Sequence, residues 1–214
     1  PHDAWTSLFS LLSAHWILPL LYWQIGRFPD PLRPDAAVLE QMRYAFLQAR
    51  IQSLRVEQQL GELVSEFSRK GIRVLVLKGP ALARTVYPDT ATRQGSDIDL
   101  LAHPHQMAGA RTVLEGLGYH CQERRFERSR DYYCEEKFFH AARPDYRLVE
   151  LHWDLHRFSG IPRNADVTEL FDRSVRVTCP PLTFEALSPP DALIHRALNN
   201  AFIHDRDMHL SWIY

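Results

Sequence analysis

The sequence predicts an α+β protein in which a sheet with flanking helices follows one helical segment and precedes another. The first observation is a helical periodicity that lasts from Leu39 to Phe67. The second is a switch at Gly71 to short β-branched segments that alternate with helical ones. The third is a helical pattern that begins with prolines after Ser188. We therefore expect a helical segment at 1–70, a core at 71–187 and a second helical segment at 188–214.

The composition is that of an ordinary globular chain. Of 214 residues, 45% are hydrophobic and 24% are charged, which excludes disordered and low-complexity proteins. Lys and Arg total 25 against 26 for Asp and Glu, so the formal charge of -1 offers no overall basic field to an extended nucleic acid. Cys121, Cys134 and Cys179 lack CxxC spacing, and we interpret them as reduced thiols without a role in the chemistry.

The first apolar segment, Leu8 to Ile25, predicts a buried amphipathic helix rather than a membrane span. It is about long enough to cross a bilayer, but Ser13, His15 and Pro19 are among the residues that interrupt it. No basic region precedes it and no small-residue cleavage site follows it, so we expect no signal peptide and a cytoplasmic location.

A long helix should follow the proline-rich segment from Phe28 to Asp35. The prolines end the preceding helix, and Asp35 can cap the next one. Apolar residues then recur with 3-4 spacing, which predicts one helix over residues 35–70. Such a helix packs either within its own chain or as a coiled coil with a second copy, so a homodimer through residues 35–70 is the alternative.

Short strands and helices alternate in the central segment. Ile72 to Leu77 is rich in β-branched residues and reads as a buried strand that follows a helix end at Gly71. Pro80 can open the next helix, because a proline at the first helical position loses no hydrogen bond. After a polar loop at 87–96 we expect a strand at 97–101, a helix at 104–117 and a strand at 118–122. Two β-hairpins should follow, one that pairs 137–141 with 147–153 and one that pairs 175–178 with 183–187. The last predicted elements are helices at 192–202 and 208–214. The last pattern is still running at Tyr214, so we expect a truncated chain.

The chemically informative segment is Gly95-Ser96-Asp97-Ile98-Asp99-Leu100. Alternate side chains of a strand share a face, so Asp97 and Asp99 project together while Ile98 and Leu100 point into the core. Two adjacent carboxylates oppose joint ionisation, and a hard divalent cation such as Mg²⁺ removes that cost. Pairs of this kind also occur on solvated edge strands, so the pattern needs support from elsewhere in the chain.

Two other segments support a functional site at Asp97 and Asp99. A strand that runs into Lys78-Gly79-Pro80 and then into a helix places a cation, a glycine and a helix N-terminus together, which suits phosphate oxygens. Glu150 lies between Val149 and Leu151 in a predicted strand, so it faces away from both and alongside His152. A carboxylate at the centre of an apolar strand needs a partner.

In this order and spacing the motifs resemble the polymerase-beta-type nucleotidyltransferase superfamily and, more narrowly, a bacterial family of uncharacterised nucleotidyltransferases. The matching residues, spread over positions 60–200, are Leu77-Lys78-Gly79, Tyr87-Pro88, Arg93, Asp97-Ile98-Asp99-Leu100-Leu101, Gly118-Tyr119 and Glu150-Leu151-His152-Trp153. The resemblance implies a polymerase-beta-like core with a mixed sheet flanked by helices. Pro80 departs from the glycine-serine pair that is usual in the superfamily.

The resemblance also implies a magnesium-dependent enzyme. It would move a nucleoside monophosphate from an NTP, for example ATP, to a hydroxyl of a small molecule, sugar, peptide or protein and release pyrophosphate. The implied catalytic and metal-binding residues, for two Mg²⁺ ions that Mn²⁺ could replace, are Asp97, Asp99 and Glu150. The implied phosphate-binding residues are Lys78, Gly79, Arg93 and Ser96. His152 and Trp153 would contact the acceptor or line the site.

Two alternatives stay open. A relative of the same fold can bind nucleotide without catalysis and act as a regulatory or binding protein. His152 and His156 have the spacing of a helical zinc pair, although a strand holds such residues apart. We also expect loss of the Asp99 carboxylate to cost little stability, because it relieves repulsion between like charges.

Overall fold

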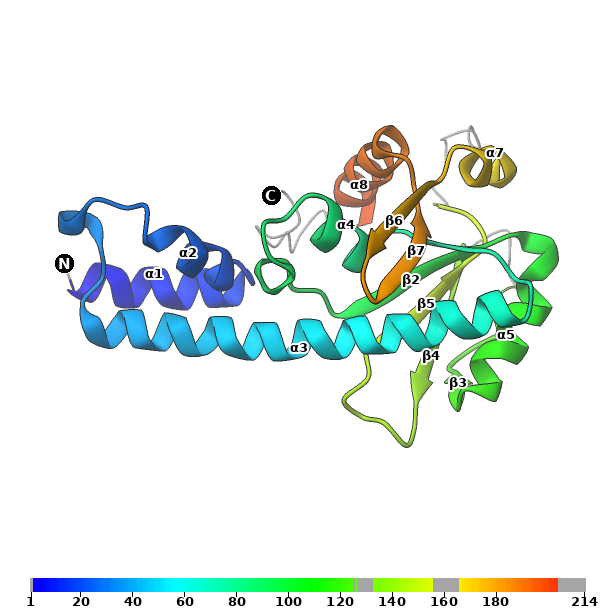
Figure 1. Ribbon diagram of the computed structural model, residues 1–214, viewed down its shortest axis with the longest axis horizontal. Helices are drawn as coiled ribbons and strands as arrows, with labels where there is room; N and C mark the ends of the chain where they lie inside the picture. The colour runs from blue at the N-terminus through cyan, green and yellow to red at the C-terminus, as the bar shows by residue number, and fades with distance from the viewer. Residues whose placement is uncertain (1, 125, 127–132, 156–165, 204–214) are drawn as a thin grey trace.

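The computed structural model describes residues 2–124, 126, 133–155 and 166–203, which contain a seven-stranded sheet in the order β3-β4-β5-β2-β1-β7-β6 (Figure 1). The strands are β1 (Val74–Val76), β2 (Asp97–Ala102), β3 (Tyr119–Cys121), β4 (Glu135–His140), β5 (Leu148–His152), β6 (Val175–Cys179) and β7 (Leu182–Ala186). The helices are α1 (His2–Ala14), α2 (Leu18–Ile25), α3 (Ala36–Arg69), α4 (Pro80–Thr85), α5 (Met107–Gly116), α7 (Val167–Asp172) and α8 (Pro189–Ile203). Short 3-10 turns are η1 (Asp30–Leu32), η2 (Thr90–Thr92) and η3 (Pro104–Gln106). The α+β class is confirmed.

The sheet is mixed, as the resemblance implies. β2 pairs in parallel with β5, and β1 pairs in parallel with β7, while the other neighbouring strands are antiparallel. The two predicted hairpins are confirmed as β4 with β5 and β6 with β7. β2 therefore lies at the centre of the sheet, between β1 and β5.

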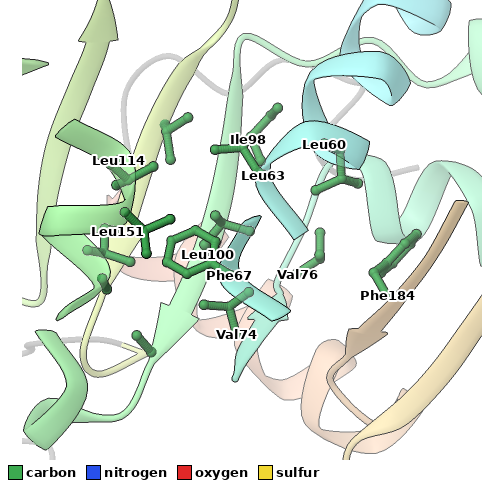
Figure 2. Packing of buried hydrophobic residues seen from close by; sticks show 14 of the residues in the cluster. Leu60, Leu63, Phe67, Val74, Val76, Ile98, Leu100, Leu114, Leu151 and Phe184 are labelled. Carbon is green, nitrogen blue, oxygen red and sulfur yellow. The ribbon is translucent and has the colours of Figure 1, made fainter. Parts of the chain in front are cut away.

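One face of the sheet packs against α3 and α5. Leu60, Leu63 and Phe67 of α3 are completely buried in one apolar cluster with Ile98 and Leu100 of β2 (Figure 2). Full burial of each such side chain stabilises the fold by about 1.5–3 kcal/mol. This contact holds the second half of α3 across the sheet.

A smaller apolar cluster lies on the opposite face. There Leu75 and Leu101 pack against Leu170 and Phe171 of α7. Strand alternation places the aspartates of β2 on the same face as Leu101, nearer the start of the strand. The two faces of β2 therefore have different chemical character.

The N-terminal segment differs from the prediction at one point. Leu8 to Ile25 spans two helices rather than one, because Trp16 adopts a left-handed φ of 58° and Pro19 lies at the start of α2. Both helices lie beside the first half of α3, away from the sheet (Figure 1), around a separate apolar cluster of Leu12, Leu18, Val38 and Met42.

The long helix α3 is confirmed. The Asp35 carboxylate caps it by accepting a hydrogen bond from Val38 N at 2.9 Å. Most of its predicted apolar face packs within the chain, with Met42, Ala49, Leu60, Leu63 and Phe67 buried, whereas Leu39 at its start is exposed. Apolar side chains elsewhere on the helix are exposed, namely Tyr44, Leu47, Ile51 and Leu54. A homodimer through residues 35–70 stays a prediction.

The patterns do not predict α7, because a six-residue helix has too few turns to show a periodicity. The predicted helix at 208–214 lies outside the described residues, as does Tyr214, on which the expectation of a truncated chain rests. Within the described part of the chain, no helix combines the length and the apolar character needed to span a membrane.

Candidate active site

Three carboxylates share one face of the central strands. Asp97 and Asp99 alternate along β2, and the parallel register sets Asp99 directly opposite Glu150 of β5. A carboxylate oxygen of Asp99, one of Glu150 and a ring nitrogen of His152 all lie within 4.8 Å of one another. Strand pairing therefore brings Asp99 and Glu150 together, with Asp97 on the same face of β2.

Cationic side chains neutralise this carboxylate cluster. Lys78 Nζ lies 2.9 Å from Asp99 Oδ1, and His152 Nε2 lies 3.0 Å from the same oxygen. Lys137 lies opposite Glu150 on β4, with its Nζ 2.8 Å from Glu150 Oε1. Asp99 is only 1% exposed and Glu150 7%, so an unpaired charge on either would be costly.

Burial and these neighbours shift the pKa values of the cluster. Burial, and then the charge of Asp99, raises the pKa of Asp97 and the pKa of Glu150. Burial also opposes ionisation of Asp99, but Lys78 and His152 hold its pKa well below the ordinary value. Burial disfavours charged His152 as well, yet Asp99 and Cys134 raise the pKa of His152 to about 10. Asp99 is therefore ionised at neutral pH, while Asp97 and Glu150 take up protons more readily than isolated carboxylates.

One buried oxygen of the cluster is available to a ligand. Asp99 Oδ2 is buried and has no hydrogen-bond partner among the described residues. Carboxylate oxygens are the ligands that Mg²⁺ and Mn²⁺ prefer. Asp99 Oδ2 and the adjacent Glu150 carboxylate therefore fit a hard divalent cation, and Asp97 projects from the same face of β2.

The turn after β1 approaches the carboxylate cluster. Gly79 has a φ of 42°, which other residues rarely adopt, and a Cβ at this position would lie 3.6 Å from Asp97 O. Pro80 then begins α4, as predicted. The turn therefore brings Lys78 to Asp99 and the backbone of Gly79 to the start of β2.

Arg93 and Ser96 lie on the loop that leads into β2. Arg93 is half-buried, its Nη1 donates to Gln94 O at 2.6 Å, and its guanidinium lies 5.8 Å from the centre of the Tyr87 ring. Burial lowers the pKa of Arg93, and the nearby Tyr87, Asp97 and Asp99 oppose that shift. The guanidinium therefore lies within the electrostatic influence of the carboxylates, whereas Ser96 is exposed.

A cavity lies between α3 and α4 beside this loop. It encloses about 50 Å³, and Gly79, Arg93 and Asp97 contribute to its lining. Three of its lining residues carry a buried polar atom without a hydrogen-bond partner among the described residues, namely Arg93 Nε, Arg147 Nε and Glu57 Oε1. Arg93, Arg147 and Glu57 therefore bring side chains with donor and acceptor groups to the lining of the cavity.

Gln59 fixes the start of β5. Its side-chain amide donates to Arg147 O at 2.8 Å, accepts from Arg147 N at 2.8 Å and also donates to Tyr119 Oη at 3.0 Å. Gln59 is almost completely buried. Because β5 carries Glu150, this contact from α3 helps to position the carboxylate cluster.

Trp153, which was expected to line the site, does not join the cluster. Trp153 lies on the opposite face of β5, in the apolar core, with its ring edge-on to Phe126 at 5.0 Å. It is therefore a core residue, because strand alternation separates it from His152. His156, the second member of the zinc alternative, lies outside the described residues.

Lys137 and Arg196 are charged neighbours that the sequence motifs did not indicate. The hairpin containing Lys137 was predictable, but the register that sets it opposite Glu150 was not. Burial, and then the charge of Arg93, lowers the pKa of Arg196 on α8 to about 10, while Tyr87 and Asp99 oppose the shift. No local pattern links a residue of α8 to a site built on β2.

Comparisons with known proteins agree with this fold. Among solved structures, the chain is similar to the solution structure of the antibiotic-resistance factor ANT(2'')-Ia, with a TM-score of 0.50, 13% identity, and coverage of 72% of this chain and 76% of that chain. At this identity the likeness shows the fold, which is polymerase-beta-like. No curated protein matches the chain. The family model described as "Uncharacterised nucleotidyltransferase" matches residues 1–214, and the chain belongs to that family.

Proposed function

We propose that this protein transfers a nucleoside monophosphate from an NTP to a hydroxyl acceptor, in a reaction that depends on Mg²⁺. The observation that carries the proposal is the row formed by Asp99 and Glu150 on adjacent parallel strands, with Asp97 on the same face and Asp99 Oδ2 buried without a partner among the described residues. In the reaction, the acceptor oxygen bonds to the α-phosphorus, the bond from that phosphorus to the bridging oxygen breaks, and pyrophosphate leaves with the electron pair.

The carboxylates would hold the metal and move the proton. Asp97 and Asp99 would bind two Mg²⁺ ions, or Mn²⁺ in their place, and Glu150 would complete one of the two sites. Bound there, the ions would polarise the α-phosphate and offset the charge that develops on the oxygens. Glu150 would accept the hydroxyl proton, a role that its raised pKa favours.

Cationic and backbone groups would hold the triphosphate. Lys78, now paired with Asp99, would exchange that carboxylate for a phosphate oxygen once a cation neutralises Asp99. The positive φ at position 79 favours glycine. Because glycine has no side chain, a phosphate can approach the backbone of this turn closely. Arg93 and the exposed Ser96 would supply further donors from the loop before β2.

The acceptor would be a small molecule, a sugar, a peptide or a protein. The formal charge of -1 gives no support to an extended nucleic-acid partner. His152 is buried beside Asp99, so in this proposal it lines the carboxylate site rather than binding the acceptor from solvent. ATP remains one candidate among the four NTPs.

A second function is a nucleotide-binding or regulatory relative without catalysis. The observation that favours it is the internal neutralisation of the carboxylates by Lys78, His152 and Lys137, which stabilises the cluster without a metal. The two functions differ in whether pyrophosphate is released.

The test incubates the full chain with each NTP labelled at the α-phosphate, Mg²⁺ and a panel of hydroxyl acceptors. We expect label on an acceptor and equimolar pyrophosphate, both lost in Asp97→Asn and Asp99→Asn. Asp145→Asn is the matched control, because Asp145 is exposed in the turn between β4 and β5. Mg²⁺-dependent NTP binding without pyrophosphate release would support the second function. If the chain neither binds any NTP nor releases pyrophosphate, both proposed functions are refuted.

A further inference from the structure

A second group of potential ligands lies beside the carboxylate cluster. It consists of Cys134, Glu135 and His152, and its ligand atoms all lie within 4.8 Å of one another. Glu135 Oε2 lies 3.7 Å from His152 Nδ1. A thiol, an imidazole and a carboxylate are a different donor set from the three carboxylates, because two of its members are soft or borderline ligands.

Strand pairing holds these three residues in place. Glu135 lies directly opposite His152 in the antiparallel pair of β4 and β5, so their side chains share a face. Cys134 precedes β4 at a bend, and its carbonyl oxygen accepts a hydrogen bond from Trp153 N at 2.9 Å. The backbone therefore fixes Cys134 beside the end of β5.

The two ring nitrogens of His152 have different surroundings. Nε2 lies 3.0 Å from Asp99 Oδ1, whereas Nδ1 is buried and has no hydrogen-bond partner among the described residues. Nδ1 is the nitrogen near Glu135, and the whole residue is only 3% exposed. A histidine that gives one nitrogen to a carboxylate and leaves the other for a cation has the arrangement found in carboxylate-histidine-zinc sites.

Among the described residues, the two oxygens of Glu135 have different neighbours. Lys137 Nζ lies 3.5 Å from Glu135 Oε1, whereas Oε2 is the oxygen nearer to His152. The same lysine is paired more closely with Glu150, at 2.8 Å. Lys137 therefore contacts a carboxylate of each donor set, Glu135 in one and Glu150 in the other.

We propose that Cys134, Glu135 and His152 bind one Zn²⁺ ion through Sγ, Oε2 and Nδ1, with water in the fourth position. Zinc accepts sulfur, nitrogen and oxygen ligands in a tetrahedral site, whereas Mg²⁺ requires oxygen. This zinc site shares only His152 with the His152–His156 pair, and its other ligands are Cys134 and Glu135. It does not depend on nucleotidyl transfer, and it would leave the oxygens of Asp97, Asp99 and Glu150 to the hard cation.

Zinc at this site would also orient the carboxylate cluster. A metal on Nδ1 would displace the proton of that nitrogen to solvent and leave the proton on Nε2, where it donates to Asp99 Oδ1. Asp99 Oδ2 then remains the oxygen available for Mg²⁺. The two sites would thus be linked through one imidazole.

The test uses Co²⁺ as a spectroscopic probe for zinc on the metal-free full chain in excess Mg²⁺ and without nucleotide. We expect one equivalent of Co²⁺ to produce a near-ultraviolet thiolate-to-cobalt band that one equivalent of Zn²⁺ removes. The band should disappear in Cys134→Ser and persist in Cys121→Ser and Cys179→Ser, the matched thiol controls. Since no nucleotide is present, this outcome is independent of whether the transfer reaction fails.

A second variant keeps the proposal testable if Cys134→Ser does not fold. Glu135→Gln retains the thiol, so the band should persist while the affinity for Co²⁺ falls at least about tenfold. The zinc site is wrong if the wild-type chain shows no saturable Co²⁺ band, if the band survives in folded Cys134→Ser, or if Glu135→Gln binds Co²⁺ with unchanged affinity.

Discussion

The two faces of β2 and β5 are both buried at the centre of the sheet but are opposite in chemistry. Leu100 and Leu151 are 0% exposed and pack against α3 and α5, whereas Asp99 and Glu150 alternate with them on the other face and are almost as buried. Burial alone therefore does not distinguish a core from a site. The difference is that each buried carboxylate has a cationic partner from a neighbouring segment, Lys78 or Lys137 in these two cases.

The two faces also differ in what they contribute to stability. Burial of the apolar face stabilises the fold by roughly 25 cal/mol per Å² of apolar surface. Desolvation of ionised groups on the other face costs several kcal/mol per ion, and the ion pairs only offset that cost. A protein that needed stability alone would place apolar residues on both faces. Retention of the charged face is the physical argument for chemistry there.

The largest effect is expected from breaking the charged face at its centre. Asp99→Ala should reduce nucleotidyl transfer by at least about 10³-fold, because loss of a metal-binding carboxylate removes several kcal/mol of transition-state stabilisation. It should also lower the free energy of unfolding by about 3–5 kcal/mol, since Lys78 and His152 lose their buried partner. Transfer of labelled nucleotide and denaturant unfolding measure the two effects, with Asp145→Ala as control.

This prediction revises the expectation from the sequence that Asp99 contributes little to stability. That expectation counted only the repulsion between Asp99 and Asp97. The structure adds two cations, Lys78 and His152, that are paired with the same oxygen. A variant as stable as the wild type would show that repulsion outweighs both pairs.

A substitution on the apolar face should lower the stability of the fold without changing the binding of Mg²⁺ and NTP. Leu100→Ala leaves a cavity beneath α3 and should lower the free energy of unfolding by about 2–5 kcal/mol. Well below its unfolding midpoint the variant should bind Mg²⁺ and NTP with wild-type affinity, because its neighbour Asp99 points the other way. Calorimetric titration tests this. Loss of NTP binding in the folded variant would show that the two faces are coupled.

Most of the fold could be predicted because its signals are local. The proline-rich segment before Asp35, the 3-4 spacing of α3 and the alternation in β5 each lie within a few turns or one strand. The break at Trp16 could not be predicted, because it depends on one residue adopting a left-handed conformation. Strand order was equally hidden, since it depends on contacts between segments far apart in the chain.

The residues of the candidate site likewise divide into those that the sequence indicates and those that only the structure reveals. Asp97, Asp99 and Glu150 are indicated by alternation along two strands, and the structure sets these strands side by side. The pairing partners could not be predicted, because Lys137 meets Glu150 only through the register of β4 and β5. Trp153 shows the limit of a motif, since it adjoins His152 in sequence and lies on the opposite face.

A third prediction concerns the contact that links α3 to β5. Gln59→Leu keeps the approximate volume but leaves the backbone N–H and C=O of Arg147 without their partner, so it should lower the free energy of unfolding by about 1–3 kcal/mol. Because β5 carries Glu150, the folded variant should also transfer nucleotide more slowly. Gln58→Leu is the matched control, since Gln58 is exposed on the same helix. Equal unfolding energies for the two variants would contradict a positioning role for Gln59.

The smallest effect is expected from loosening one ion pair while the carboxylates stay intact. Burial and Asp99 raise the pKa of Glu150, and Lys137 counteracts them, so Lys137→Gln should raise that pKa further. Transfer needs ionised Glu150 as proton acceptor, and it therefore declines as the pH falls through this pKa. The acidic limb of the pH–rate profile should move to higher pH in Lys137→Gln, with little change on the alkaline side. Lys70→Gln, which alters an exposed lysine beyond the end of α3, should leave the profile unchanged. An acidic limb that stays in place, or moves to lower pH, would mean that a group other than Glu150 accepts the proton.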